Sequence, residues 1–238
     1  MAASKLKTGV PGLDTIFKGG IREKSSVLVS GGPGTGKTIL TMQFLVEGAK
    51  RKEPGLFILY DAEEGLLDYA DSLGIEIRKF VKSGMIHIVQ ESSMIRKFSS
   101  IAVPLDIITK KRIKRVVLDS LTMFAYIHTT DDKEYRKEIL NFLHSMRNIT
   151  LLATTEMTES NLDDLSFKPE DFMFDGIVFL TKVRQGSSFE RVLHVGKMRG
   201  QDHLINLYPF FIGKGGIKVY PDQIPFSLAQ KDTAQKSN

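Results

Sequence analysis

The sequence contains the stretch Gly31-Gly32-Pro33-Gly34-Thr35-Gly36-Lys37-Thr38, which satisfies the pattern G-x-x-x-x-G-K-[ST]. It follows the short apolar run Val27 to Ser30 and opens a helix that we expect to extend to about Lys52. A strand, a glycine-rich turn and a helix in this order form a loop whose backbone N–H groups surround phosphate oxygens. We therefore predict that Gly31–Thr38 binds the phosphates of ATP.

Two side chains at the end of this stretch carry the predicted chemistry. The ammonium group of Lys37 should reach the β- and γ-phosphate oxygens, and the Thr38 hydroxyl should ligate Mg²⁺. A carboxylate near the metal should end a buried strand, and the run Arg115-Val116-Val117-Leu118-Asp119 supplies one. Asp119 is therefore the predicted carboxylate on the Mg²⁺ side, although an aspartate at the end of a strand could instead cap a helix.

Short runs rich in β-branched residues alternate with helix-like stretches over most of the chain. The expected strands are Ser26–Ser30, Leu56–Tyr60, Met85–Val89, Arg115–Asp119, Ile149–Thr154 and Gly176–Thr181. The clearest helix is Lys133–Arg147, whose apolar stripe consists of Tyr135, Ile139, Phe142, Leu143 and Met146. Because strands joined by helices run parallel, we predict an α/β fold with a mostly parallel sheet flanked by helices.

The pattern changes after Gly176, where strand-like segments follow one another through tight turns. The segments Phe189–Gly196, Leu207–Ile212 and Ile217–Tyr220 are expected to add antiparallel strands to one side of the sheet. The acidic segment Thr158–Pro169 is expected to be a surface loop, either a plain connection or the lining of a partner surface. We expect residues 1–228 to form a single domain and the polar tail at 229–238 to be disordered.

Composition excludes several classes of protein. The 238 residues, 42% of them hydrophobic, can bury the core of one large domain. There is no cysteine, which excludes disulfides and thiolate metal sites, and the five histidines have no metal-ligand spacing. The start of the chain has no leader-like apolar stretch, and no apolar run reaches about 18 residues. We expect a cytoplasmic protein that does not span a membrane.

With these elements placed, the sequence resembles the KaiC-type branch of the RecA/RadA ATPases, in particular small single-domain archaeal KaiC-like proteins. The resemblance runs almost from end to end. Besides the phosphate loop, it rests on Thr8–Asp14, Gly19–Ile21, Gln43–Leu45, Glu53–Gly55, Thr154–Glu156, Phe174–Gly176, Lys197–Gly200 and Tyr208–Phe210. It implies a RecA-like P-loop NTPase core and a homo-oligomer, such as a hexameric ring, that holds ATP between neighbouring subunits. Relatives also use the stretch corresponding to Ile212–Gly216 near the base or ribose, and this chain departs from their pattern there.

The motif Lys197-Met198-Arg199-Gly200 has a role in trans in the family. The resemblance implies that Lys197 and Arg199 reach the γ-phosphate of the neighbour's ATP, with Arg199 similar to an arginine finger. Two residues apart on a strand, both side chains would project from one face. They could instead be solvated cations that protect an edge strand from aggregation.

The acids that activate water in this family are displaced or replaced here. Relatives place two adjacent glutamates at the end of the second strand, where this chain has Tyr60-Asp61-Ala62-Glu63-Glu64. A base must approach within about 3 Å of the water that it activates. We favour Asp61 as that base and keep Glu63 as the alternative, because acids in the first turn of a helix also stabilise the helix dipole.

Three functions remain open at this point. The first is a Mg²⁺-dependent ATPase acting as a ring, and the second is a nucleotide-gated assembly or regulatory module with little or no hydrolysis. The third is a RadA-like accessory ATPase on DNA, for which the net charge of +5 is weak support. The basic run Lys110-Lys111-Arg112 with Lys114-Arg115 could contact nucleic acid, but we expect it to be a solvated run at the end of a helix.

Overall fold

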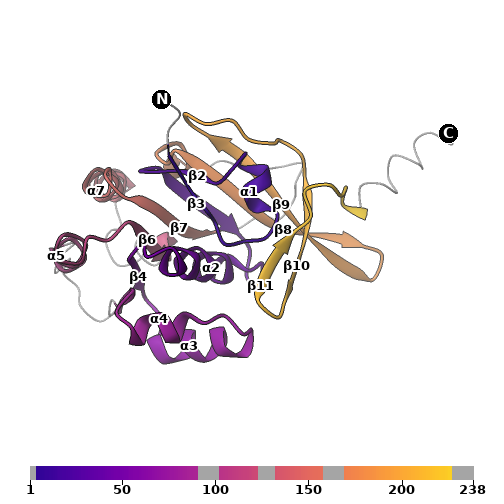
Figure 1. Ribbon diagram of the computed structural model, residues 1–238. Coiled ribbons are helices and arrows are strands. Elements are labelled where there is room, and N and C mark those ends of the chain that lie inside the picture. The colour runs from indigo at the N-terminus through magenta and orange to yellow at the C-terminus, as the bar shows by residue number, and fades with distance from the viewer. Residues whose placement is uncertain (1–3, 91–101, 123–131, 158–168, 227–238) are drawn as a thin grey trace, which may run out of the picture.

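Figure 1 shows a computed structural model of the chain, which describes residues 4–90, 102–122, 132–157 and 169–226. Of the predicted loop Thr158–Pro169, only Pro169 belongs to these residues, and the predicted tail at 229–238 lies outside them. The predictions for these two segments therefore stay predictions.

A nine-stranded sheet forms the centre of the molecule, in the order β11-β10-β9-β8-β3-β7-β6-β4-β5. Its parallel part consists of β3 (Ser26–Gly31), β4 (Gly55–Leu59), β5 (Ile86–Gln90), β6 (Arg115–Asp119), β7 (Thr150–Glu156) and β8 (Gly176–Gln185). The antiparallel part adds β9 (Ser188–Met198), β10 (Tyr208–Gly213) and β11 (Gly216–Val219). The predicted α/β fold with antiparallel strands at its C-terminal side is confirmed.

Helices cover both faces of the parallel part (Figure 1). On one face lie α2 (Lys37–Lys50), α3 (Glu63–Ser72) and α4 (Ile77–Lys82), and on the other lie α5 (Ala102–Lys111) and α7 (Asp132–Ser145). Alternate residues of a strand pack into the two cores: Val27 and Val29 face α2, whereas Leu28 faces the opposite side. Burial on both faces is why these strands are continuous apolar runs in the sequence.

Most predicted elements agree with the structure to within one or two residues at each end. The helix predicted at Lys133–Arg147 is α7, whose stripe buries Ile139 and Phe142; Met146, just after its end, is buried too. β8 is longer than predicted because its polar second half, which includes Lys182 and Arg184, pairs with β9 as a hairpin. Short elements that we did not predict are β1 (Lys5–Leu6) and β2 (Ile21–Arg22), which pair with each other, α1 (Leu13–Ile16) and the 3-10 helix η1 (Pro169–Phe172).

One cation of the predicted solvated run is not solvated. Lys110, Lys111, Arg112 and Lys114 are exposed at and after the end of α5, as expected, but Arg115 is fully buried, with 0% of its surface exposed. Arg115 is the first residue of β6, a central strand of the sheet. The expectation that the whole run is solvated was therefore wrong at Arg115.

Polar contacts explain how a guanidinium fits in this core. Arg115 Nε donates to Glu53 Oε2 at 2.8 Å, and Nη1 donates to the carbonyl oxygens of Lys7 at 2.7 Å and Phe44 at 2.9 Å. The Phe44 ring centre lies 4.5 Å from Arg115 Cζ. Burial lowers the pKa of Arg115, while the hydrogen bond with Glu53 raises it. Arg115 thus ties β6 to α2, the N-terminal segment and the turn before β4.

Replacing Gly48 in α2 by alanine is expected to destabilise the fold, although alanine normally favours a helix over glycine by about 1 kcal/mol. A Cβ at position 48 would lie 2.4 Å from Cδ of Arg115. Because Arg115 cannot move aside without breaking its hydrogen bonds, we expect the free energy of unfolding to fall by about 1–3 kcal/mol in urea denaturation.

The matched control is Gly65→Ala in α3, where no atom lies within 4 Å of the added Cβ. This substitution should raise the free energy of unfolding by about 0.5–1 kcal/mol. If Gly48→Ala and Gly65→Ala change the free energy of unfolding by the same amount, Arg115 does not prevent a larger side chain at position 48 of α2.

Candidate functional site

The phosphate loop lies at the carboxyl end of β3, with α2 beginning at Lys37. The Thr35 hydroxyl donates to the carbonyl oxygen of Gly32 at 2.8 Å and so holds the turn. Gly36, the N-cap residue of α2, has φ +105°, and a Cβ there would lie 2.9 Å from Cδ1 of Ile212 on β10. The loop thus needs glycine at this position, and the β10–β11 hairpin packs directly against it.

Lys37 lies folded onto the loop that precedes it. Its Nζ donates to the carbonyl oxygens of Gly31 at 2.8 Å and Gly32 at 3.1 Å. Burial lowers the pKa of Lys37, the negative charges of Asp119 and Glu156 raise it, and a nearby Lys182 lowers it. Phosphate oxygens are stronger partners for an ammonium group than carbonyl oxygens, so a bound polyphosphate would draw Lys37 away from these carbonyls.

Thr38 and Asp119 come together as predicted. The Thr38 hydroxyl donates to Asp119 Oδ2 at 2.7 Å, and the Thr154 hydroxyl donates to Oδ1 at 2.5 Å. Asp119 ends β6 and Thr154 lies in β7, which separates β6 from β3 in the sheet. The carboxylate is therefore oriented from two sides at the mouth of the phosphate loop.

The donor set fits a Mg²⁺ ion that comes with a nucleotide. Mg²⁺ is usually bound by one or two protein oxygens, several waters and the substrate's phosphates. The Thr38 hydroxyl and the Asp119 carboxylate supply such oxygens next to Lys37. Within the described ranges, no group of three or more His, Cys, Asp or Glu side chains is placed so that it could hold a metal ion.

Sequence reasoning assigned no role to three residues around this loop. Lys182 on β8 donates through Nζ to the carbonyl oxygen of Pro33 at 3.0 Å, which places a second cation on the loop. Glu156 ends β7 and contributes negative charge near Lys37. Thr154 orients Asp119. Parallel pairing of β7 and β8 with β3 brings these residues to the loop. Thr154 and Glu156 belong to a stretch that carries the family resemblance, whereas the sequence around Lys182 shows only a polar residue near the end of an apolar strand.

The two candidate bases lie at the carboxyl end of β4, beside β6. The backbone N–H of Tyr60 donates to the carbonyl oxygen of Asp119 at 3.2 Å, which places the following residues near the metal-side carboxylate. Asp61 is exposed, and Glu63 is the half-buried first residue of α3. Glu64 is bound to Arg78 at 2.7 Å. The choice between Asp61 and Glu63 stays a prediction.

Lys197 and Arg199 lie where the parallel strands β3 and β8 begin. The phosphate loop of the same chain lies at the opposite edge of the sheet, where β3 ends. Lys197 pairs with Ile177 near the start of β8, whereas Gly31 of the loop pairs with Leu180 further along that strand. Both cations reach η1: Lys197 Nζ donates to the carbonyl oxygen of Asp171 at 2.8 Å, and Arg199 Nη2 donates to that of Phe172 at 3.0 Å. Burial lowers the pKa of Lys197, and Arg199 lowers it further. The two cations share one side, as expected from their spacing.

The strand order, the phosphate loop after β3 and the carboxylate at the end of β6 define a P-loop NTPase with a RecA-like core. The sequence profile described as "ATPase: KaiC" matches residues 6–224. The chain therefore belongs to the KaiC-type ATPase family, and this membership makes it an ATP-binding P-loop ATPase in general terms.

The chain resembles both relatives that are about twice its length and relatives of about its own length. The circadian clock oscillator protein KaiC of Synechococcus elongatus is 31% identical over 92% of this chain, which spans only 45% of that relative. The UPF0273 protein PH0284 of Pyrococcus horikoshii is 32% identical over 92% of this chain and 95% of its own length. The crystal structure of the KaiC-like protein PH0186 from the same organism superposes with a TM-score of 0.80 at 30% identity, covering 92% of this chain and all of that one. In the part of the chain that the structure describes, no helix is both long and apolar enough to cross a membrane.

Proposed function

We propose that the chain hydrolyses ATP in a Mg²⁺-dependent reaction, in an oligomer that holds each ATP between two copies. The observation that carries this proposal is the contact of Thr38 with Asp119, at 2.7 Å, beside the partly buried ammonium of Lys37. These are the side chains that a metal-bound triphosphate requires on the protein side.

Each residue of the site has a role in this proposal. The backbone of Gly31–Thr38 and the Lys37 ammonium bind the β- and γ-phosphates, and Lys182 adds a second cation from the side of Pro33. Thr38 and Asp119 hold Mg²⁺, with Thr154 fixing the Asp119 carboxylate. Bound Mg²⁺ neutralises charge on the β- and γ-phosphates.

The attacking water needs a base from the carboxyl end of β4. Asp61 is our first assignment and Glu63 our second, because both follow the strand next to β6. The base takes a proton from water as its oxygen attacks the γ-phosphorus, and ADP leaves with the bridging oxygen. If neither carboxylate reaches the water, ATP is bound and held, which is the nucleotide-gated assembly that the displaced acids favour.

The position of Lys197 and Arg199 supports action on a neighbour's ATP. They lie at the edge of the sheet where β3 begins, and the phosphate loop lies at the edge where β3 ends. Copies arranged head to tail would bring one edge of each copy against the other edge of the next, an arrangement that forms a ring when the rotation between copies closes. Arg199 then stabilises the charge that develops on the neighbour's γ-phosphate.

Mixing two inactive variants tests this arrangement. Arg199→Ala should bind ATP but lose about 1,000-fold in kcat, and Lys37→Ala should fail to bind ATP while keeping Arg199. In an equimolar mixture, roughly one quarter of the interfaces would combine an intact loop with an intact arginine, so we expect phosphate release well above that of either variant alone.

Two outcomes of the mixing experiment would contradict the proposal. If the mixture releases phosphate no faster than the mean of the two variants measured separately, Arg199 does not act in trans. If the unmodified chain binds ATP but releases no phosphate at any protein concentration, nucleotide-gated assembly replaces hydrolysis as the function.

A further inference from the structure

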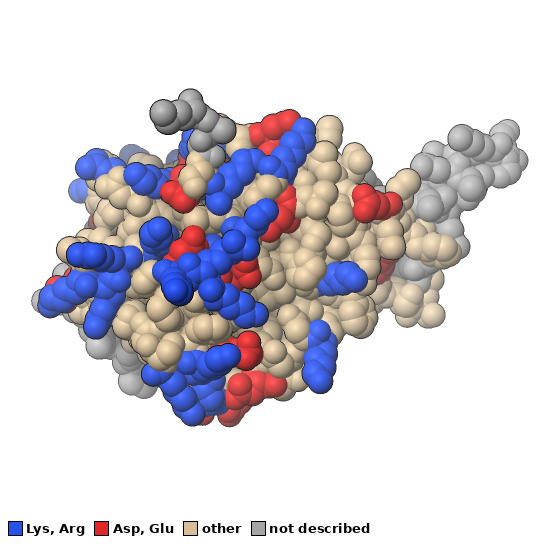
Figure 2. Space-filling view, viewed as in Figure 1, with Lys and Arg blue, Asp and Glu red and all other residues tan. Residues whose placement is uncertain are grey.

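One arginine joins the two neighbouring helices α3 and α4. Arg78 of α4 donates through Nη1 to Glu64 Oε1, through Nη2 to Asp68 Oδ1 and through Nε to Asp71 Oδ2, each at 2.7 Å. All three carboxylates belong to α3, which lies beside α4 at the bottom of Figure 1. In Figure 2, acidic and basic side chains meet at this end of the molecule. A single guanidinium thus holds carboxylates from three successive turns of α3.

The three carboxylates lie on one stripe of α3. Positions i, i+4 and i+7 of a helix share a face, so Glu64, Asp68 and Asp71 would repel one another without a cation between them. Arg78 is more covered than two of its partners, with 26% of its side chain exposed against 70% for Glu64 and 71% for Asp68. Lysine is a poor substitute, because only a guanidinium presents several N–H groups in fixed directions. The network is therefore built around Arg78.

The first turn of α3 depends on this contact because its own sequence stabilises it weakly. The N-cap residue is Ala62, whose side chain cannot accept a hydrogen bond from the N–H groups that begin the helix. Gly65 in the same turn favours a helix less than most other residues do. The buried residues of α3 begin only at Leu66. Through Glu64, Arg78 therefore supplies from outside the helix the support that this turn lacks.

The other end of α3 is tied to the phosphate loop through the β10–β11 hairpin. The N–H of Gly215, at the tip of this hairpin, donates to the carbonyl oxygen of Leu73 at 2.6 Å, directly after the last residue of α3. Ile212 of the same hairpin packs against Gly36 of the phosphate loop. The hairpin thus fixes where α3 ends, and Arg78 fixes how α3 is turned about its axis. Together they give the start of α3 a defined place relative to the phosphate loop.

The start of α3 carries the acids that the proposed reaction needs. Asp61 stands two residues before the helix, and Glu63 is its first residue. Successive residues of a helix point about 100° apart, so a bond that fixes Glu64 also fixes the direction in which the Glu63 side chain leaves the helix. The contact between Arg78 and Glu64 therefore bears directly on the place of the two candidate bases.

We propose that Arg78 is a positioning residue of the ATPase, which fixes the first turn of α3 so that Asp61 and Glu63 stand in place to take a proton from the attacking water. This inference rests on the proposed function, which takes the base from that turn. A displacement of about 1 Å in a reacting group can slow a step about 100-fold. Loss of Arg78 should therefore slow hydrolysis far more than it weakens ATP binding, because binding depends on Gly31–Thr38 and Asp119.

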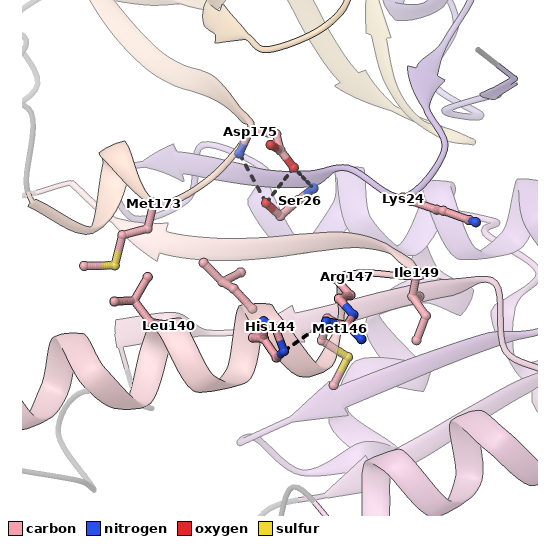
Figure 3. Close-up of a pocket in the computed structure, with 10 residues that line it drawn as sticks. Lys24, Ser26, Leu140, His144, Met146, Arg147, Ile149, Met173 and Asp175 are labelled. Carbon is pink, nitrogen blue, oxygen red and sulfur yellow. Dashed lines mark hydrogen bonds between the residues drawn. The ribbon is translucent and has the colours of Figure 1, made fainter.

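A charged pocket at the opposite edge of the sheet has a different place in the proposed assembly. Its volume is about 320 Å³, and Lys24, Arg147 and Asp175 are among the residues that line it, where β3 and β7 begin (Figure 3). Asp175 accepts hydrogen bonds from the N–H and the hydroxyl of Ser26, at 2.9 and 3.1 Å. The neighbouring copy of the proposed ring would cover this edge. α3 instead follows the carboxyl end of β4, so Arg78 acts in the copy that holds the ATP.

Steady-state ATP turnover in the presence of Mg²⁺ tests the proposal in Arg78→Ala and Arg78→Lys. The matched control is Arg51→Ala, which removes an exposed arginine that pairs with Glu47 of α2. We expect Arg78→Ala to lower kcat by about 10- to 100-fold and to change the Kd of a fluorescent ATP analogue by less than about 3-fold. Arg78→Lys should recover part of kcat, and Arg51→Ala should behave like the unmodified chain.

Two further measurements show whether Arg78 acts through the base of its own copy. When Arg78→Ala is combined with Asp61→Asn or Glu63→Gln, whichever of these lowers kcat by itself, we expect no further loss, because residues that act as a unit are not additive. An equimolar mixture of Arg78→Ala with Lys37→Ala should recover no phosphate release, in contrast to the mixture with Arg199→Ala. The copy that binds ATP still lacks Arg78 in such a mixture.

Amide hydrogen exchange tests the support of the first turn without any turnover. The N–H of Leu66 donates to the carbonyl oxygen of Ala62 at 3.2 Å and closes this turn. In the chain without nucleotide, we expect the Leu66 amide to exchange at least about 10-fold faster in Arg78→Ala than in the unmodified chain. The amides of α2 should exchange at the same rate in both.

The proposal is overturned if Arg78→Ala leaves kcat unchanged, if kcat and ATP affinity fall equally, or if the mixture with Lys37→Ala regains activity. It is also overturned if the loss adds in full to that of Asp61→Asn and of Glu63→Gln, or if the exchange of Leu66 is unchanged. If the unmodified chain binds ATP and releases no phosphate while Leu66 exchanges faster in Arg78→Ala, the ATPase proposal fails and Arg78 still fixes the first turn of α3.

Discussion

Replacing Lys37 by alanine is expected to weaken ATP binding by about 100-fold or more, measured by titration with a fluorescent ATP analogue in the presence of Mg²⁺. The expected effect is large because Lys37 is a partly buried cation beside Asp119 and Glu156. Without it, these two carboxylates would face the triphosphate with only Lys182 on the loop to offset them. Phosphate release should fall at least as much as binding.

A matched control is Lys52→Ala, which removes an exposed lysine just beyond the other end of α2. It should leave ATP binding unchanged. Burial disfavours the charged form of Lys37 in the folded chain, so a neutral residue there should not lower stability in the absence of nucleotide. A marked fall in melting temperature of Lys37→Ala would therefore assign the weaker binding to misfolding and contradict the direct role of Lys37.

Replacing Arg115 by alanine is expected to lower the free energy of unfolding by about 3–5 kcal/mol in urea denaturation. The substitution removes a side chain that is fully buried and leaves Glu53 without its cation. It also removes the donor to two backbone carbonyl oxygens, those of Lys7 and Phe44. The energetic effect is large because one side chain joins several segments that are distant in the sequence.

Arg112→Ala provides the control for the removal of an arginine, because Arg112 is exposed in the same basic run. Its effect should stay within about 0.5 kcal/mol. The double variant Arg115→Met, Glu53→Met should recover part of the stability, since no unpaired carboxylate remains near the core. If Arg115→Ala costs no more than Arg112→Ala, the buried hydrogen bonds of Arg115 do not support the fold.

The phosphate loop could be predicted because the residues that define it are neighbours in the sequence. Glycines, Lys37 and Thr38 stand within one short stretch, and the strand before it and the helix after it have clear apolar patterns. Asp119 could be predicted from the type of strand that it ends. The parallel sheet followed from the alternation of strands with helices, which leaves few other topologies.

Contacts between distant parts of the chain could not be predicted in this way. Arg115 looks like the last member of a solvated basic run, and its burial depends on Glu53 and on carbonyl groups far away in sequence. Lys182 looks like a polar residue of a hairpin until the pairing of β8 with β3 places it at Pro33.

The anchoring of Lys197 and Arg199 on η1 also bears on how neighbouring sites would communicate. β7 ends at Glu156, whose charge acts on Lys37 of the same copy's phosphate loop, and the chain continues from there to Pro169, where η1 begins. η1 in turn accepts hydrogen bonds from the two cations assigned to the next copy's ATP. The sequence therefore joins the surroundings of a copy's own phosphate loop to the segment that supports the two cations that we propose act on its neighbour's ATP. In the proposed ring, each copy would therefore hold its own nucleotide and support the cations for its neighbour's with two segments, β7 and η1, that are consecutive elements of the chain among the described residues.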